Sequence, residues 1–376
     1  MGIIKNEDLG WDDFFESKRA EMGLGDFSVA RVIAEYKGAY KVKNENGEFL
    51  AKITGKQMFK AESREDYPAV GDWVAMSELD NEQAVIQAVL PRKSTIKRRF
   101  GDKNKSGEKN DVQVIATNVD VAFIVESVGR DYNVNRLERY LAIAKDASIK
   151  PVIVINKTDL ILDEESDSKL AEIKNRVEDI DVIFTSAVNN EGLDKLKAYI
   201  QKGKTCCFLG SSGVGKSSLI NKLLGKDDIK TGDVSSYSDR GKHVTTNREM
   251  YFLPARRSLG AGGESGGIVI DNPGIREVGV ADANAEKNSV FDDIAILAKN
   301  CKYVDCTHIH EPGCEVLKAL KDGTLDEAKY SNYISLKKEA EYLEMSQFEK
   351  KNKNRSFGKF LKKAKKDFSK FGHKDF

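Results

Sequence analysis

The sequence predicts a protein of three folded parts: a small β-barrel, a doubly wound α/β domain and a mostly helical C-terminal region. Three observations support this. Short strands separated by turns follow one another between residues 30 and 90. Apolar strands then alternate with amphipathic helices from residue 120 onward, as in parallel sheets that are covered on both faces. Three of the five cysteines lie close together within residues 301–314.

Size and composition are those of a globular protein. The chain has 376 residues, enough for two or three domains, and 40% of them are hydrophobic. The 61 basic and 60 acidic residues nearly cancel, but residues 349–376 carry eleven Lys or Arg against three acids. No stretch approaches the roughly 18–20 apolar residues of a membrane helix, and the first residues lack a secretion signal. An odd number of cysteines, clustered as metal ligands are, fits a reducing compartment, so we expect a cytoplasmic protein with no membrane partner.

The barrel is expected to follow a partly helical extension over residues 1–27. Asn46-Gly47 is typical of a tight hairpin turn because both residues tolerate positive φ. The five expected strands lie at 32–34, 39–43, 49–53, 70–76 and 84–90. Five short strands within about 60 residues suit a small closed barrel, of which the oligonucleotide-binding (OB) fold is a common kind. A small barrel with no nucleic-acid role fits this stretch equally well.

A basic stretch separates the barrel from the α/β domain. Residues 91–110 hold eight Lys or Arg against two acids and are interpreted as an exposed linker. The apolar, β-rich runs that follow are 121–125, 151–155, 182–185, 205–209 and 267–270. Apolar residues recur at helical spacing between them, at Leu137, Tyr140, Leu141 and Ala144 and at Leu193, Leu196 and Ile200. We therefore expect a doubly wound sheet, then a mostly helical region over 288–345 and a basic tail.

The most specific motif is a glycine-rich loop between a strand and a helix. It comprises Gly210, Ser211, Ser212, Gly213, Val214, Gly215, Lys216 and Ser217, and Ser218 follows in the helix. Glycines let the backbone N–H groups converge on phosphate oxygens at the helix N-terminus. In such a loop Lys216 reaches the β- and γ-phosphates, and Ser217 binds Mg²⁺. A glycine-rich turn without function rarely combines this whole string with this setting.

Guanine recognition is predicted from two polar turns that each follow an apolar strand. The first is Asn156, Lys157, Thr158 and Asp159, and the second is Thr185, Ser186 and Ala187. A carboxylate at Asp159 accepts hydrogen bonds from guanine N1–H and the exocyclic amine, which adenine does not offer in that place. Asn156 would tie this turn to the phosphate loop, the Lys157 stem would lie over the purine, and the second turn would offer a backbone N–H to guanine O6. The combination favours GTP and GDP over ATP.

Two further segments match the magnesium and γ-phosphate side of such a site. Asp271 follows a strand in the string Asp-Asn-Pro-Gly, where it would hold a Mg²⁺-bound water while the Gly274 N–H senses the γ-phosphate. Upstream lies a polar, Gly-rich stretch in which Thr245 or Thr246 would close on Mg²⁺, and the residues leave that choice open. His243 belongs to the same stretch, and a solvated loop histidine is its simplest interpretation.

These motifs stand in permuted order along the chain. Base recognition precedes phosphate and Mg²⁺ recognition, whereas ordinary GTPases run the other way. A permuted chain can still build the same sheet, because a fold depends on which elements pair. The segment after Asp271 then leads almost directly into the C-terminal region, and we hypothesise that nucleotide state is coupled to that region through this proximity.

Four candidate metal ligands lie within 14 residues: Cys301, Cys306, His308 and Cys314. Three thiolates and an imidazole favour Zn²⁺ in a closed, tetrahedral, structural site. A helical module of roughly 55 residues with a small core gains stability from such a staple. Buried free cysteines are the alternative interpretation, and His310 is a rival ligand.

The motif order, the barrel and the Cys-Cys-His-Cys module together resemble the RsgA (YjeQ) family of small ribosomal subunit biogenesis GTPases over about residues 28–345. The likeness is carried by Gly71-Asp-Trp-Val74, Asn118-Val-Asp120, Gly213-Val-Gly-Lys-Ser217 and Glu311-Pro-Gly-Cys314. It implies an OB-fold barrel, a low intrinsic GTPase activity stimulated by the small ribosomal subunit, and a late role in maturation of that subunit.

The resemblance also bears on individual residues. It ranks His308 above His310 as a metal ligand, and it makes His243 the switch-loop histidine considered for catalysis. Ile275 then stands in place of a water-positioning Gln. Two strings depart from the family: Gly-Lys-His-Val-Thr-Thr replaces Gly-Arg-His-Thr-Thr-Thr, and Asp-Asn-Pro-Gly replaces Asp-Thr-Pro-Gly. The first departure leaves the Mg²⁺-binding threonine undecided.

The expected organisation follows from these motifs. The boundaries are 1–27 for the extension, 28–95 for the OB fold, 96–287 for the circularly permuted GTPase domain, 288–345 for the zinc-binding domain and 346–376 for the basic tail. The leading hypothesis is a GTPase that binds ribosomal RNA of the small subunit through barrel, linker and tail, and that leaves after hydrolysis. One alternative is a non-catalytic binding module whose conformation depends on bound GTP; such a protein would bind GTP without hydrolysing it. Another alternative is a kinase, which Asp159 disfavours. We expect a monomer with one structural zinc ion and with Mg²⁺ bound beside GTP.

Overall fold

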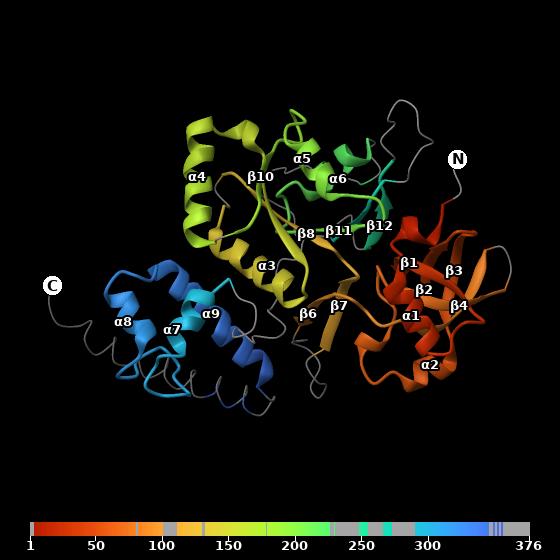
Figure 1. Cartoon of the computed structure of the whole chain (residues 1–376), viewed down its shortest axis with the longest axis horizontal. Helices are drawn as coiled ribbons and strands as arrows, with labels where there is room; N and C mark the ends of the chain where they lie inside the picture. Colours follow the sequence, from red (N-terminus) through yellow and green to blue (C-terminus); the bar gives the residue numbers. More distant parts are fainter. Residues whose placement is uncertain are drawn as a thin grey trace, which may run out of the picture.

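The computed structural model describes residues 4–79, 82–100, 111–129, 132–177, 179–225, 229, 248–254, 266–272, 290–345, 349, 352 and 355. Figure 1 shows three blocks that follow the chain: the barrel in red and orange, the α/β domain in yellow and green, and a helical C-terminal module in blue. Within this described part, every helix falls short of the length or the hydropathy that a membrane crossing requires.

The N-terminal block is a closed barrel of five strands. They are β1 (Ser28–Tyr36), β2 (Ala39–Asn44), β3 (Gly47–Ile53), β4 (Trp73–Glu78) and β5 (Gln83–Val89). The order β1-β2-β3-β5-β4 closes on itself because β4 also pairs with β1, and only the β3–β5 pair is parallel. Alternate residues such as Val42, Ala51 and Ile86 fill the interior. The predicted small closed barrel is confirmed.

The N-terminal extension covers one side of the barrel. Its helical elements are η1 (Asn6–Leu9) and α1 (Asp13–Glu21), and between the barrel strands lie α2 (Gly55–Lys60) and η2 (Arg64–Asp66). Asp12 caps α1 by accepting a hydrogen bond from the Phe14 N–H. Phe15 packs on the fully buried Trp73 of β4. The extension thus packs on the side of the barrel, and its predicted partly helical character is confirmed.

The α/β block is built on six strands in the order β10-β9-β8-β11-β13-β12. They are β8 (Val121–Ser127), β9 (Lys150–Asn156), β10 (Val182–Thr185), β11 (Thr205–Leu209), β12 (Glu249–Phe252) and β13 (Ile268–Asp271). All pair in parallel except β12, which runs antiparallel to β13. One residue pair, Ala34 with Glu249, joins this sheet to β1 of the barrel. The five predicted strands are confirmed, whereas β12 was not predicted.

Helices cover both faces of this sheet. The helices α3 (Val134–Asp146) and α4 (Asp163–Arg176) lie on one face, and α5 (Leu193–Tyr199) and α6 (Lys216–Leu224) on the other. Residues of β9 alternate between the two sides: Ile153 and Ile155 pack toward α3, whereas Val152 and Val154 pack toward α5 and α6. The predicted doubly wound arrangement is therefore confirmed.

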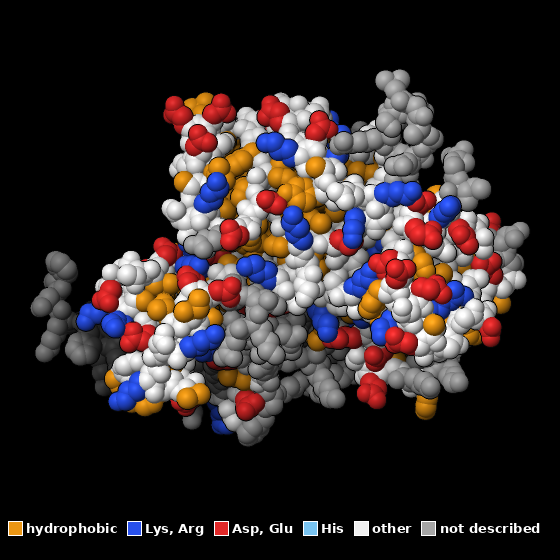
Figure 2. Space-filling model, in the orientation of Figure 1, with side chains coloured by type: hydrophobic (Ala, Val, Ile, Leu, Met, Phe, Trp, Pro, Cys, Tyr) orange, Lys and Arg blue, Asp and Glu red, His pale blue; other side chains and the backbone are white. Residues whose placement is uncertain are grey.

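The basic stretch 91–110 is not an exposed linker along its first half, so that prediction is wrong there. Residues Thr95–Phe100 form β6, which pairs antiparallel with β7 (Asp111–Thr117), and the Ile96 side chain is fully buried. The net charge of this stretch did not predict its exposure, because acidic side chains elsewhere in the barrel neutralise part of it. Lys97, for example, pairs with Glu65 at 2.8 Å. Figure 2 shows basic and acidic side chains interspersed over the barrel in the same way. Residues 101–110 lie outside the described part.

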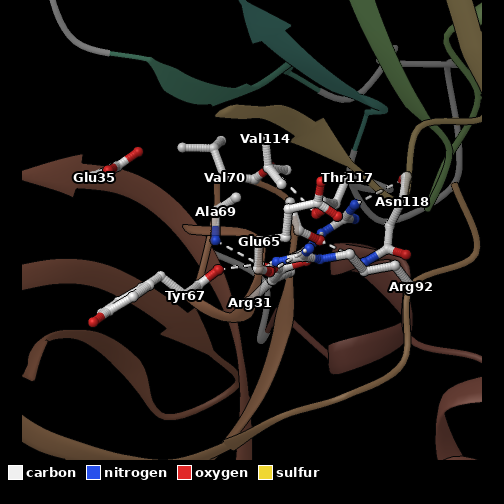
Figure 3. A network of polar contacts seen from close by, with 12 residues as sticks. Arg31, Glu35, Glu65, Tyr67, Ala69, Val70, Arg92, Val114, Thr117 and Asn118 are labelled. Carbon is white, nitrogen blue, oxygen red and sulfur yellow. Dashed lines mark hydrogen bonds and ion pairs between the residues drawn. The ribbon is translucent and has the colours of Figure 1, made fainter. Parts of the chain in front are cut away.

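A buried arginine joins the extension, the barrel and the α/β domain (Figure 3). The Arg31 guanidinium donates hydrogen bonds to the carbonyl oxygens of Leu9, Gly71 (3.3 Å) and Asn118 (3.1 Å), one from each of these parts. Burial lowers the Arg31 pKa to about 10. Gly71 has a φ of +101°, and a Cβ there would lie 2.1 Å from the Thr117 oxygen. Only glycine therefore allows the barrel to approach the α/β domain this closely.

A second arginine organises the barrel beside this joint. Arg92 donates to both Asp72 carboxylate oxygens, at 2.7 and 2.8 Å, in a bidentate pair (Figure 3). It also donates to the carbonyl oxygens of Glu65 (2.8 Å) and Tyr67 (3.0 Å). Because Asp72 has no exposed surface, this pair is screened little by solvent. Arg92 thus fixes the segment that leaves β5 onto the barrel through buried polar contacts.

Replacing Arg31 by methionine is expected to lower the free energy of unfolding by about 3 kcal/mol, because carbonyl oxygens from three segments lose their shared buried donor. Denaturant or thermal unfolding of the purified variant measures this change. Arg19→Met is the matched control, since Arg19 also donates to three carbonyl oxygens, but all within the nearby loop 24–27. The control variant should lower the free energy of unfolding by less than about 1 kcal/mol. If both variants lowered the free energy of unfolding equally, the Arg31 contacts between the three segments would have no special role in stability.

The C-terminal module packs against α3. Its helices are α7 (Asp292–Ala298), α8 (Glu315–Lys321) and α9 (Glu327–Glu344), and their buried apolar residues are continuous with the α3 side of the sheet core. Polar contacts fix α9 on α3: Arg139 pairs with Glu339 at 2.7 Å, and the Asn332 amide donates to the buried Glu138 carboxylate at 2.5 Å. Arg176 of α4 also pairs with Glu138, at 2.8 Å. The predicted mostly helical region is confirmed; most of the predicted basic tail, 346–376, lies outside the described residues.

Candidate nucleotide and metal sites

The glycine-rich loop lies at the carboxyl end of β11 and leads into α6. Lys216 opens that helix with only 6% of its side chain exposed, and its Nζ donates to the carbonyl oxygens of Gly210 (2.8 Å) and Ser211 (2.7 Å). Burial lowers the Lys216 pKa to about 8, although the carboxylates of Asp271 and Glu126 oppose this shift. A buried ammonium among backbone N–H groups forms a positive site suited to phosphates.

The loop that follows β9 contacts the glycine-rich loop directly. The Asn156 amide Nδ2 donates to the Val214 oxygen at 2.9 Å, and Lys157 Nζ donates to the Gly213 oxygen at 2.7 Å. Gly215 has a φ of +96°, and a Cβ there would lie 2.3 Å from Asn156 Nδ2. Two segments that lie almost sixty residues apart in the sequence thus meet at one edge of the sheet.

Hydrogen bonds also organise the two polar turns that were assigned to the base. Ser186 donates from its hydroxyl to Asp159 Oδ1 at 2.5 Å, and it accepts from the Asn189 N–H at 3.1 Å. Thr185 donates to Asn156 Oδ1 at 3.1 Å, and Thr158 donates to the Thr185 oxygen at 3.1 Å. Ser186 is buried whereas Asp159 is exposed, so a buried hydroxyl orients a carboxylate that faces solvent. Ala187 follows in the same turn and is half-buried.

Asp271, at the end of β13, completes the described part of the phosphate side. Its carboxylate is almost fully buried. Burial raises the Asp271 pKa, whereas the Lys216 ammonium and the nearby Ser217 hydroxyl act to lower it. Within the described residues Asp271 Oδ1 has no hydrogen-bond partner. A hydroxyl and a carboxylate side by side are the hard oxygen donors that Mg²⁺ prefers, so these residues fit that ion.

The remaining predicted groups on this side lie outside the described residues. These are His243, Thr245, Thr246 and Gly274.

The four predicted metal ligands converge in the C-terminal module. The ligand atoms of Cys301, Cys306, His308 and Cys314 all lie within 4.8 Å of one another. Cys301 Sγ is 3.8 Å from Cys314 Sγ, and these two sulfurs lie 3.6 and 3.5 Å from His308 Nδ1. A tetrahedral ion with bonds of about 2.0–2.3 Å separates its ligand atoms by about 3.5–3.8 Å. The cluster can therefore hold one metal ion; His310 is not part of it.

Residues around the cluster hold its loop in place. The Glu311 carboxylate accepts hydrogen bonds from the N–H groups of Thr307 (3.1 Å), Ile309 (3.1 Å) and His310 (3.2 Å), as well as from the Thr307 hydroxyl. These bonds, the Thr307 hydroxyl first, hold the Glu311 pKa well below its usual range. Tyr330 of α9 donates to the His308 oxygen at 2.7 Å. Burial also lowers the His308 pKa, which favours the neutral imidazole that metals bind.

Two residues of these sites were missed as contributors by the sequence reasoning. Glu126 is a fully buried carboxylate at the end of β8, beside the start of the glycine-rich loop. The signal was a charged residue near the end of a mostly apolar, fully buried strand, beside Ser127, which pairs with Asn156 of β9. Glu311 belongs to one of the family motifs, but the motif assigned it no role. Its hydrogen bonds with three backbone N–H groups form only when the loop is folded.

Comparisons with known proteins give a consistent result. A sequence profile described as RsgA GTPase matches residues 89–281. A small ribosomal subunit biogenesis GTPase RsgA 1 of Bacteroides thetaiotaomicron is 37% identical over 357 residues, which covers 95% of this chain and 96% of that protein. An RsgA protein of Opitutus terrae is 39% identical and covers 89% of each chain. The crystal structure of YjeQ from Thermotoga maritima is similar with a TM-score of 0.59 and 25% identity, covering 83% of this chain and 98% of that one. YloQ, described as a circularly permuted GTPase, shares the fold with a TM-score of 0.55.

Proposed function

The chain belongs to the RsgA family of GTPases and hydrolyses GTP, and from this premise we propose that it acts in late maturation of the small ribosomal subunit. In its GTP state it binds ribosomal RNA of that subunit, and hydrolysis releases it. The protein is cytoplasmic and acts as a monomer. Relatives at 37% and 39% identity that are named for biogenesis of the small subunit support this assignment.

One observation carries the nucleotide part of the proposal. The hydrogen bond from Asn156 to the Val214 oxygen, at 2.9 Å, places the base-reading turn against the phosphate loop. A single guanine nucleotide can therefore contact Asp159 with its base and Lys216 with its phosphates. Each motif alone occurs in other proteins, and their contact at one sheet edge supports the proposal of a guanine nucleotide site there.

Specific roles follow for the residues of this site. Lys216 and the backbone N–H groups of Gly210–Ser217 bind the phosphates, while Asp159, Ser186 and Ala187 select guanine. Ser217 and either Thr245 or Thr246 would hold Mg²⁺, and Asp271 would hold a water of that ion. When bound, Mg²⁺ supplies neutralisation of the phosphate charge.

Two further groups would act on the γ-phosphate side. The Gly274 N–H would contact the γ-phosphate, and His243 would orient the attacking water. Both are assigned from the family pattern of the sequence, in which Ile275 occupies the usual glutamine position.

We propose zinc as the ion of the cysteine–histidine cluster. Three thiolates and one imidazole are the ligands that Zn²⁺ prefers over Mg²⁺ or Ca²⁺. With four protein ligands no coordination position remains for substrate, so the role is structural. The ion would tie the loop 301–314 to α8, since Cys314 also accepts a hydrogen bond from the Leu317 N–H at 3.4 Å.

Replacing Asp159 by asparagine should weaken GTP binding about tenfold to hundredfold, because the amide presents a donor to the donor edge of guanine. Xanthine carries a carbonyl where guanine has its amine, so XTP binding should improve in the same variant. Titration with fluorescent analogues of both nucleotides measures the switch. Asp163→Asn, an exposed acid in the first turn of α4, is the matched control and should change neither affinity. An unchanged preference for GTP in Asp159→Asn would contradict the base assignment.

The proposed function is tested by phosphate release from GTP and from ATP, with and without purified small subunits. We expect slow release from GTP alone, faster release with small subunits, and no comparable release from ATP. GTP binding without hydrolysis, even with subunits present, would favour the alternative of a non-catalytic binding module whose conformation depends on bound GTP. Turnover that ignores the subunits would remove the ribosomal part of the proposal.

A further inference from the structure

Strand β12 connects the α/β sheet to the barrel. It lies between β13 and β1 in the strand order, where the two blocks meet in Figure 1. All four residues of β12 pair with β13, whereas a single pair, Ala34 with Glu249, joins β12 to β1. One backbone pair is a small connection, so the position of β12 against the barrel depends also on side-chain contacts at its two ends.

Arg248, directly before β12, makes two of these contacts. Its Nη1 donates a hydrogen bond to the Val114 oxygen of β7 at 3.1 Å, and the same nitrogen lies 3.8 Å from a carboxylate oxygen of Glu35 on β1. Only 16% of the Arg248 side chain is exposed, so these contacts are partly shielded from water. At the other end of β12 the Phe252 ring packs on the barrel, and Lys43 Nζ lies 5.1 Å from the ring centre. Strand β12 is thus held on the barrel at both ends.

The same strand lies next to the proposed magnesium side of the nucleotide site. Glu249 pairs on one side with Ala34 of the barrel and on the other with Asp271, the last residue of β13. Neighbouring strands lie about 4.7–4.9 Å apart, so the barrel backbone is two strand spacings, about 10 Å, from the backbone of Asp271. The phosphate loop follows β11, which is one strand farther from the barrel. A shift of β12 would therefore reach Asp271 before it reached the phosphate loop.

We propose that Arg248 is a positioning residue for Mg²⁺, which holds the start of β12 against the barrel and β7 and thereby keeps Asp271 where the ion requires it. This inference rests on the proposed role of Asp271 in holding a water of Mg²⁺. The competing explanation is that Arg248 only joins the domains. Loss of a purely structural contact lowers stability and affects nucleotide binding equally with and without Mg²⁺, whereas loss of a positioning contact weakens only the binding that depends on Mg²⁺.

Arg248→Met tests the proposal, because methionine keeps much of the apolar stem and removes both polar contacts. The affinity for a fluorescent GTP analogue is measured with saturating Mg²⁺ and again with excess chelator. With Mg²⁺ the variant should bind about three- to tenfold more weakly than the unmodified protein, near the lower end of the range for coupling between sites. With chelator the two proteins should agree within about twofold. Arg248→Lys, which keeps a positive charge for Glu35, should recover part of the loss.

Two controls make the result unambiguous. Arg139→Met removes another partly exposed arginine, which pairs with Glu339 and joins α3 to α9, and it should leave both affinities unchanged. Unchanged affinity in Arg248→Met with Mg²⁺, or equal losses with Mg²⁺ and with chelator, would overturn the inference. If Arg248→Met does not fold, an unchanged effect of Mg²⁺ on binding in Glu35→Ala does the same. Asp271→Asn separates the two levels: if Mg²⁺ strengthens its binding as in the unmodified protein, the proposed magnesium site itself is wrong. If that effect is lost in Asp271→Asn but kept in Arg248→Met, only the role of Arg248 fails.

Discussion

Lys216→Ala should reduce the affinity for GTP and GDP by at least about a hundredfold. A buried ammonium that makes two or more charge-assisted hydrogen bonds to phosphates contributes about 3–6 kcal/mol to binding. In the free protein the same ammonium is costly, since burial lowers its pKa to about 8. The nucleotide-free variant should therefore unfold at a temperature no lower than the unmodified protein. Titration with fluorescent nucleotides and thermal unfolding without nucleotide measure the two effects.

Lys222→Ala is the matched control for this prediction. Lys222 lies on the same helix, α6, but is exposed to solvent. Its replacement should leave nucleotide affinity unchanged. Retained GTP binding in Lys216→Ala would contradict the assignment of the glycine-rich loop, whereas lost binding in both variants would point to a general effect on α6.

Replacement of His308 by alanine should abolish stable metal binding and destabilise the C-terminal module. Removing one of four ligands opens the site to water, and structural zinc sites of this kind bind with about 10–16 kcal/mol that is also folding energy. Metal content by atomic emission should fall from one ion per chain to a small fraction of that. Thermal unfolding should show an early transition, because α8 and α9 pack on the cluster and contribute to the core beside α3.

His310→Ala provides a control only two residues away. His310 is exposed and lies outside the cluster, so this variant should keep its metal and its unfolding temperature. Loss of metal in His310→Ala, with retention in His308→Ala, would reverse the assigned ligand. Removal of the metal from the unmodified protein by a strong chelator should reproduce the His308→Ala transition.

Local patterns in the chain were sufficient for most elements. Strands β2 and β3 of the barrel alternate more and less buried residues, and Asn46-Gly47 marks the hairpin between them. The glycine-rich loop can be recognised from the sequence because its residues are contiguous and follow a fully buried strand, β11. The metal ligands lie within one short loop, so their spacing predicted a metal cluster, whereas the family resemblance was needed to rank His308 above His310.

Patterns were misleading where neighbours distant in the chain supply the environment. Residues 95–100 carry three basic side chains and were interpreted as solvated. They form β6 because Ile96 is buried against the α/β domain while Glu65 neutralises Lys97. Strand β12 is short, with Glu249 at its start, and it is a strand because it pairs with β13. A strand of only four residues has too weak an intrinsic preference to be recognised from its sequence.

The residues proposed for chemistry lie in contiguous segments: the glycine-rich loop, the two turns proposed to bind guanine and the Cys-Cys-His-Cys loop. How these segments come together in space does not follow from the segments themselves, because it depends on the order of strands in the sheet. Placing β8, β9 and β11 side by side brings the Asn156 amide to the Val214 oxygen. The buried contacts of Arg31 with three segments arise in the same way. Hydrogen bonds between groups far apart in the chain form only once packing has removed water from both partners, and no local spacing encodes which partners those will be.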